Sequence, residues 1–93
     1  MLNLEDQMIY KAFVKDNLTN KRTFLEYDYP NKKQFAHDIR ANGYSVSRIE
    51  PKELYDFMLD HTNCTPSEWK AAKTIWNKGL GLTRENLLKE LWA

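Results

Sequence analysis

The first segment with a clear pattern of apolar and polar positions shows the alternation of a β-strand. Residues 8–15 place every second residue, from Met8 to Val14, on one face. A helix capped by Asn3 is the alternative interpretation of these residues. The strand is favoured because residues 16–21 have the composition of a turn and are followed by a second β-rich segment.

That second segment, residues 23–29, alternates β-forming residues with acids and ends at Pro30. The two segments therefore predict a β-hairpin. In this hairpin we expect Leu25 and Tyr27 to lie on the core face, opposite the apolar face of the first strand.

A helix is predicted over residues 32–42. Asn31 and Gln34 stand at the spacing of a capping box, and Gly43 supplies the left-handed residue that ends many helices. The apolar face of this helix comprises Phe35, Ala36 and Ile39.

Residues 44–49 then read as a third strand. A strand–helix–strand connection of this length is expected to be right-handed. The third strand would pair beside the first, which gives a three-stranded sheet with a helix across one face.

The remaining chain is predicted to be helical. Pro51 fits the first position of a helix over residues 51–61, and Thr65–Glu68 is a capping box for a second helix that ends near Gly79. Thr83 caps the last helix. The stripes expected to be buried are Leu54, Tyr55, Phe57, Met58 and Leu59 in the first of these helices, Trp69, Ala72, Ile75 and Trp76 in the second, and Leu87, Leu88, Leu91 and Trp92 in the third.

Composition agrees with one small α+β domain over residues 1–93, in which a ββαβ half precedes three helices. The chain is 42% hydrophobic and 29% charged, which is typical of a globular protein, and its net charge is +1. It holds no apolar run of roughly 18 residues, and residues 1–6 are acidic where a signal peptide would be basic. A single cysteine, Cys64, excludes an intramolecular disulfide. We therefore expect a cytoplasmic protein without membrane partners.

Asp60, His61 and Cys64 form the nearest approach to a catalytic or metal-binding group, with His37 as a further metal ligand. His61 falls on the apolar side of its helix and Cys64 precedes a helix cap, so the favoured interpretation is a half-buried histidine and a small apolar cysteine. Paired Cys/His spacings and glycine-rich phosphate loops are absent. We expect no enzyme activity, no cofactor and no metal.

Nucleic-acid binding is one function class that the residues allow. The predicted helix over residues 66–78 carries a polar arc beside its tryptophan stripe, and the earlier helix adds two cations. Such side chains could contact phosphates. The candidate binding residues are Lys70, Lys73, Asn77 and Lys78 on the later helix and Lys33 and Arg40 on the earlier one.

Protein binding is the favoured function class. All three tryptophans lie in the last quarter of the chain, and tryptophan is over-represented at interface hot spots. The C-terminal helix with Leu91 and Trp92 could dock on this domain, on a second copy to make a homodimer, or on another protein. The exposed hairpin edge is a further contact surface. We expect a non-catalytic protein-binding module that uses the lysine arc and the Trp92 helix.

Residues 35–46, preceded by the hairpin turn over residues 16–21, resemble small orphan proteins of phages and mobile elements of Gram-positive bacteria. The likeness covers about a third of the chain. It implies roles such as regulating replication or transcription, or blocking a host enzyme or defence complex. No functional residue is carried over from it.

Overall fold

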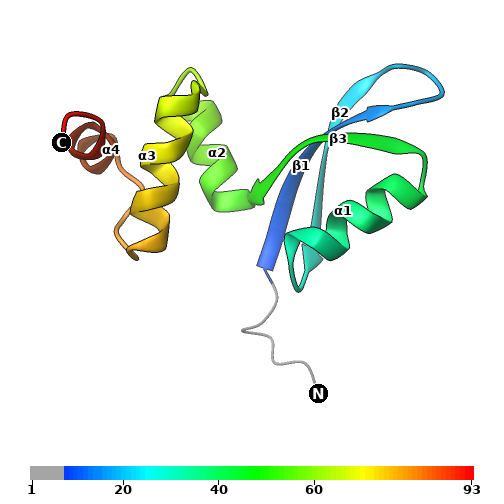
Figure 1. Ribbon diagram of the computed structural model, residues 1–93, viewed down its shortest axis with the longest axis horizontal. Coiled ribbons are helices and arrows are strands. Elements are labelled where there is room, and N and C mark those ends of the chain that lie inside the picture. The colour runs from blue at the N-terminus through cyan, green and yellow to red at the C-terminus, as the bar shows by residue number, and fades with distance from the viewer. Residues whose placement is uncertain (1–7) are drawn as a thin grey trace. The chain divides into compact units, whose positions relative to one another are not determined.

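The computed structural model describes residues 8–93, which divide into two compact units, residues 8–52 and residues 53–93 (Figure 1). The acidic segment at residues 1–6 and the alternative cap at Asn3 lie outside the described residues. That the whole chain forms one domain stays a prediction.

The first unit has the predicted ββαβ order. Its elements are β1 (Met8–Asp16), β2 (Arg22–Tyr29), α1 (Lys32–Ala41) and β3 (Tyr44–Pro51). The α+β class is confirmed, as is the choice of a strand rather than a helix for the first segment.

The sheet has the strand order β2-β1-β3, with β1 antiparallel to both of its neighbours. Ala12 lies opposite Leu25 on one side and Ile49 on the other, and Tyr10 lies opposite Tyr27. The third strand therefore pairs beside the first, and Leu25 and Tyr27 share its core face, as predicted. A bulge at Ser47 shifts the β1–β3 register between Phe13 and Val14.

The hairpin turn is built by the Asp and Asn residues that predicted it. The Asn20 N–H donates to the Asp16 carbonyl at 2.7 Å, and the Leu18 N–H donates to Asp16 Oδ1 at 2.9 Å. Asn20 has a φ of 62°, a left-handed conformation that asparagine tolerates better than most residues.

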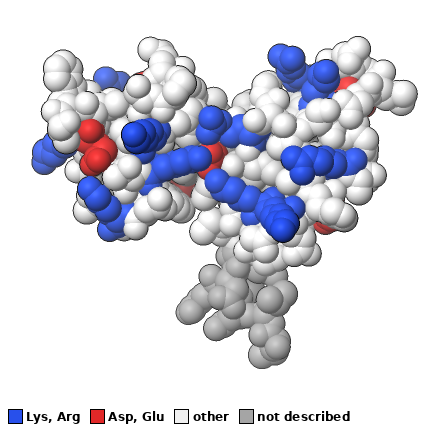
Figure 2. Space-filling model, viewed as in Figure 1, with Lys and Arg blue, Asp and Glu red and all other residues white. Residues whose placement is uncertain are grey.

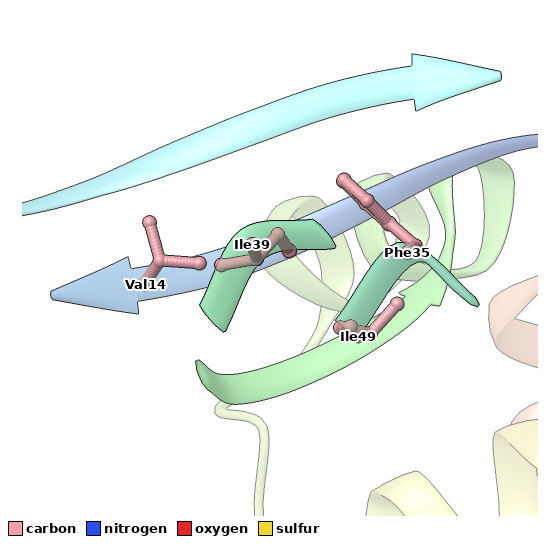
Figure 3. Packing of buried hydrophobic residues seen from close by; sticks show 5 residues of the cluster. Val14, Phe35, Ile39 and Ile49 are labelled. Carbon is pink, nitrogen blue, oxygen red and sulfur yellow. The ribbon is translucent and has the colours of Figure 1, made fainter. Parts of the chain in front are cut away.

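Helix α1 begins and ends at the predicted signals. The Gln34 N–H donates to Asn31 Oδ1 at 2.8 Å, and Gly43 has a φ of 88°. The buried face of α1 packs on β1 and β3 to form the core of this unit (Figure 3). The core residues are Ala12, Val14, Phe35, Ile39 and Ile49.

The remaining helices are α2 (Lys52–His61), α3 (Pro66–Asn77) and α4 (Arg84–Leu91). The prediction that Pro51 is the first helical residue is wrong, because Pro51 is the last residue of β3 and lies opposite Tyr10. The Asn17 N–H donates to the Gly43 carbonyl, which identifies a hydrogen-bonded pair just beyond the end of β1. Such pairs alternate along an antiparallel strand, so the odd-numbered residues of β1 hydrogen-bond to β3 and Tyr10 does not. A proline therefore fits there without loss of a ladder hydrogen bond.

The predicted capping box of α3 is confirmed. The Glu68 N–H donates to Thr65 Oγ1 at 3.3 Å, and the Thr65 N–H donates to Glu68 Oε1 at 3.2 Å. The hydrogen bonds from Thr65 lower the pKa of Glu68 below its ordinary value. Thr83 caps α4 by accepting from the Asn86 N–H at 3.1 Å.

The second unit has a core of its own, in which Tyr55 meets Trp69 edge-on at 5.3 Å. Ala71 joins this core, although the sequence did not single it out. The buried residues are Leu54, Tyr55, Phe57, Met58, Trp69, Ala71, Ala72, Ile75 and Leu87. Within residues 8–93, every helix is too short or too polar to cross a bilayer.

Several residues that we expected in the buried stripes are not buried. Trp76 is only partly covered, because it lies at the margin of the α3 stripe. Leu59 precedes the exposed Asp60 at the polar end of α2 and is itself exposed. In α4 the helix is short and buries only Leu87, so its other apolar residues face solvent. Those exposed residues are Leu88, Leu91 and Trp92.

Candidate functional site

An open groove of about 450 Å³ lies between α1 and β2 in the first unit. Leu25 and Tyr29 of β2 pack against the core, but the inner face of β2 is not fully covered. The side chain of Tyr27 remains 57% exposed there. The groove is lined by Leu25, Tyr27, Tyr29, Phe35, Asp38, Ile39, Asn42 and Tyr44.

The groove has a fixed aromatic wall. The Tyr29 ring stacks on the buried Phe35 ring at 4.6 Å between centroids, and the Tyr27 ring meets Phe35 edge-on at 6.2 Å. Phe35 is 2% exposed and belongs to the core, so it holds the two tyrosines against a rigid support. Aromatic surface held in this way loses little conformational entropy when a ligand packs on it.

Asp38 is the one carboxylic acid among the lining residues. The Tyr29 hydroxyl donates to Asp38 Oδ2 at 2.6 Å, and this bond lowers the pKa of Asp38 and raises the pKa of Tyr29. The Asp38 side chain is 46% exposed. The groove therefore presents a carboxylate that stays ionised at neutral pH and is accessible from solvent.

None of the lining residues was a predicted site residue. The lining residues come from β2, from α1 and its C-cap, and from the first residue of β3. These segments lie close together only because of where α1 packs on the sheet. One signal was present in the sequence: Leu25, Tyr27 and Tyr29 give β2 three large inward-facing side chains. The neighbouring helix offers only two large apolar residues, Phe35 and Ile39, to cover the whole sheet face.

The lysine arc predicted on α3 is on the helix, but its members differ in environment. Lys70 and Asn77 are exposed, whereas Lys73 is partly buried. Lys78 Nζ lies 3.6 Å from Glu90 Oε2, so its charge is already paired. Residues 53–93 carry five Lys/Arg and six Asp/Glu, so this helical unit has no positive excess.

The positive excess lies in the first unit. Residues 8–52 carry nine Lys/Arg and five Asp/Glu. Lys33 and Arg40 are both exposed on α1, as the sequence suggested. Figure 2 shows Lys and Arg side chains on the surface of both units, so the excess of the first unit is a matter of its composition.

Trp92 is the most exposed of the tryptophans. It is the residue that caps the C-terminus of α4 and is 84% exposed, with Leu88 at 45% beside it on the same helix. The partly buried Trp76 lines a separate hollow with Phe57 and Leu80. The second unit thus offers an isolated apolar projection and a hollow of about 430 Å³, in whose wall the His61 ring lies against Phe57.

The structure does not assemble a catalytic group from the residues that suggested one. The interpretation of His61 as half-buried is wrong, because its ring is exposed and lies against Phe57 at 5.1 Å. The thiol of Cys64 lies 3.7 Å from the Met58 carbonyl oxygen and 3.9 Å from Thr62 Oγ1. Among residues 8–93, no group of three or more His, Cys, Asp or Glu side chains is placed to hold a metal ion.

Comparison of the chain with protein-family models, curated proteins and solved structures finds no match in any of the three.

Proposed function

We propose that this chain is a non-catalytic protein-binding module that contacts its partner through the groove between α1 and β2. The observation that carries the proposal is the aromatic wall of Tyr27, Tyr29 and Phe35 beside the ionised Asp38. Specific recognition sites commonly combine apolar and aromatic side chains with a small number of placed polar groups.

The groove indicates the chemistry of the partner. An apolar or aromatic side chain would pack on Tyr27 and Leu25, and a neighbouring lysine or arginine would meet the Asp38 carboxylate. The resemblance to small phage and mobile-element proteins supports a regulatory role for such binding. The single cysteine is consistent with action in the cytoplasm.

The test is capture from nuclease-treated lysate of the source cells, with the tagged full chain as bait. We expect wild type to retain one protein in stoichiometric amount. Tyr27→Ala removes an exposed ring from the groove and should abolish capture, whereas Trp92→Ala, its matched exposed aromatic control, should retain it. Circular dichroism verifies that both variants fold. Capture retained by Tyr27→Ala and lost by Trp92→Ala would place the contact on α4 instead.

A second variant tests the charge. Asp38→Asn keeps the shape of the groove and removes its one carboxylate. We expect it to weaken capture by at least about tenfold, because a charge-assisted hydrogen bond contributes about 1.5–3 kcal/mol. Unchanged affinity would contradict the predicted basic group on the partner.

Nucleic-acid binding is the second candidate, and the observation that favours it is the excess of nine Lys/Arg over five Asp/Glu in residues 8–52. Lys33 and Arg40 on α1 would then contact phosphates. Lys70, Lys73, Asn77 and Lys78 support it less, because their unit has no positive excess. A salt-dependent gel shift that falls in a Lys33→Glu, Arg40→Glu variant would favour this function over protein binding.

A further inference from the structure

Within the described part of the chain, β2 is an outer strand of the sheet. The Asp16 N–H donates to the Lys21 carbonyl at 2.8 Å, which identifies a hydrogen-bonded pair of the hairpin. Such pairs alternate in an antiparallel ladder, so the odd-numbered residues of Thr23–Tyr29 bond to β1. The backbone groups of the even-numbered residues of Arg22–Asp28 consequently point outward from the sheet.

The side chains along this edge carry opposite charges at its two ends. Arg22 and Asp28 are both exposed, and within residues 8–93 neither makes an ion pair. Glu26, between them, is already engaged by Lys11 at 3.2 Å and by Lys52 at 3.8 Å. An edge with a cation at one end and an anion at the other is complementary to an antiparallel copy of itself.

We infer that two copies of this chain pair through β2, antiparallel, with Leu25 of each copy on the two-fold axis. This register places Arg22 of each copy opposite Asp28 of the other and makes two ion pairs. Sliding the strands by two residues in one direction sets Glu26 against Glu26. Sliding them in the other direction sets Arg22 against Glu26, which already has partners.

The pairing covers exposed apolar surface on both faces. On the face that carries α1, Leu25 meets Leu25 and the 57% exposed Tyr27 meets Thr23 of the second copy. On the other face the two Phe24 rings, each 41% exposed, are diagonal neighbours within reach of one another. Pro30 has no N–H and follows the last strand residue, so the ladder ends there.

The result is a continuous six-stranded sheet with both copies of α1 on the same face. The two grooves then lie on either side of the axis. A partner with two recognition segments would bind such a dimer by avidity. The dimer does not depend on the proposed function, since the edge of β2 is present whether or not the groove binds a partner.

Sedimentation velocity of the full chain over a range of concentrations tests this inference. We expect a monomer–dimer equilibrium for wild type. Arg22→Asp and Asp28→Arg should each weaken dimerisation by at least about tenfold, because each sets like charges opposite one another twice in the dimer. An equimolar mixture of the two variants should dimerise again, because every such pair in the mixed dimer is then of opposite charge.

Trp92→Ala is the control, because a dimer through α4 would use that side chain. We expect it to dimerise like wild type, and circular dichroism verifies that all variants fold. A wild-type chain that stays monomeric at every concentration overturns the inference. So does a dimer that Trp92→Ala abolishes while Arg22→Asp does not, and so does a mixture that fails to restore dimerisation.

Discussion

The groove of the first unit and the α3–α4 surface of the second unit both expose aromatic rings, but they expose them in different ways. In the groove, Tyr29 stacks on the buried Phe35 and Tyr27 meets the same ring edge-on. On α4, Trp92 caps the helix and is 84% exposed. The groove rings are held by the core, whereas the α4 ring is supported by one short helix.

The charged groups of the two regions differ in the same way. Asp38 is held by the Tyr29 hydroxyl at 2.6 Å and faces an open groove. Lys78 is paired with Glu90, and Lys73 is partly buried. A residue type that is typical of binding sites is therefore a weaker guide than a side chain that is both fixed by its neighbours and accessible.

The largest expected effect is on the free energy of unfolding, and it distinguishes the buried Phe35 ring from the exposed Trp92 ring. Phe35→Ala should destabilise the first unit by about 3–5 kcal/mol, because it removes a core ring and leaves a cavity. Trp92→Ala should change stability by less than about 0.5 kcal/mol. Urea unfolding followed by circular dichroism measures both, and equal losses would remove the contrast between the two regions.

A second prediction sharpens the comparison within α3. Trp69 is 5% exposed and packs on Tyr55, whereas Trp76 is partly exposed beside a hollow. Trp69→Ala should lower the free energy of unfolding by about 3–5 kcal/mol. Trp76→Ala should lower it clearly less, because Trp76 buries less apolar area on folding. Thermal unfolding of the two variants compares them. A larger loss at Trp76 than at Trp69 would contradict this ranking of the two positions.

The capping box of α3 gives a smaller effect. Thr65→Ala should destabilise the helical unit by about 1 kcal/mol, because the Glu68 N–H loses its acceptor. The pKa of Glu68 should rise toward its ordinary value in this variant. In wild type the lowered pKa means that the ionised carboxylate stabilises the fold above pH 4.5 and that this contribution is lost as the pH falls through the lowered pKa.

Carboxyl NMR titration of Glu68 in wild type and in Thr65→Ala checks the direction of that shift. An unchanged titration curve would contradict the assigned cause.

The smallest expected effect concerns the Tyr29–Asp38 pair. Tyr29→Phe keeps the stacked ring and removes the donor, so the pKa of Asp38 should rise toward 3.8. The ionised form of Asp38 contributes stability above that pH, and this contribution is lost below it as the carboxylate protonates. Stability below pH 4 should therefore depend less on pH in Tyr29→Phe, as acid unfolding would measure. The same pH dependence of stability below pH 4 in both proteins would show that the Tyr29 hydroxyl does not lower the pKa of Asp38.

The sequence predicted the elements of the fold because their signals are local. Asp16 and Asn20 in the turn, Asn31 and Gly43 at the ends of α1, and the Thr65 capping box all act within a few residues. Alternation in β1 and β2 predicted which residues face the core.

The groove could not be predicted in the same way, because it depends on where α1 rests across the sheet. Phe35 contacts both Tyr29 and Tyr27, yet Tyr27 remains 57% exposed because α1 does not extend over the whole face of β2. That Arg22 and Asp28 lie on an outer edge of the sheet likewise depends on the strand order. Lysines and tryptophans were prominent in the sequence, but prominence of a residue type carries no information on such packing.

Site-specific photo-crosslinking tests the central claim most directly. A photoreactive phenylalanine analogue would replace Tyr27 in one protein and Trp92 in another, and both would be irradiated in nuclease-treated lysate of the source cells. Apart from adducts to a second copy of this chain, we predict one covalent adduct of defined mass with another protein from position 27 and none from position 92. An adduct from position 92 alone would contradict the account and would place the contact surface on α4.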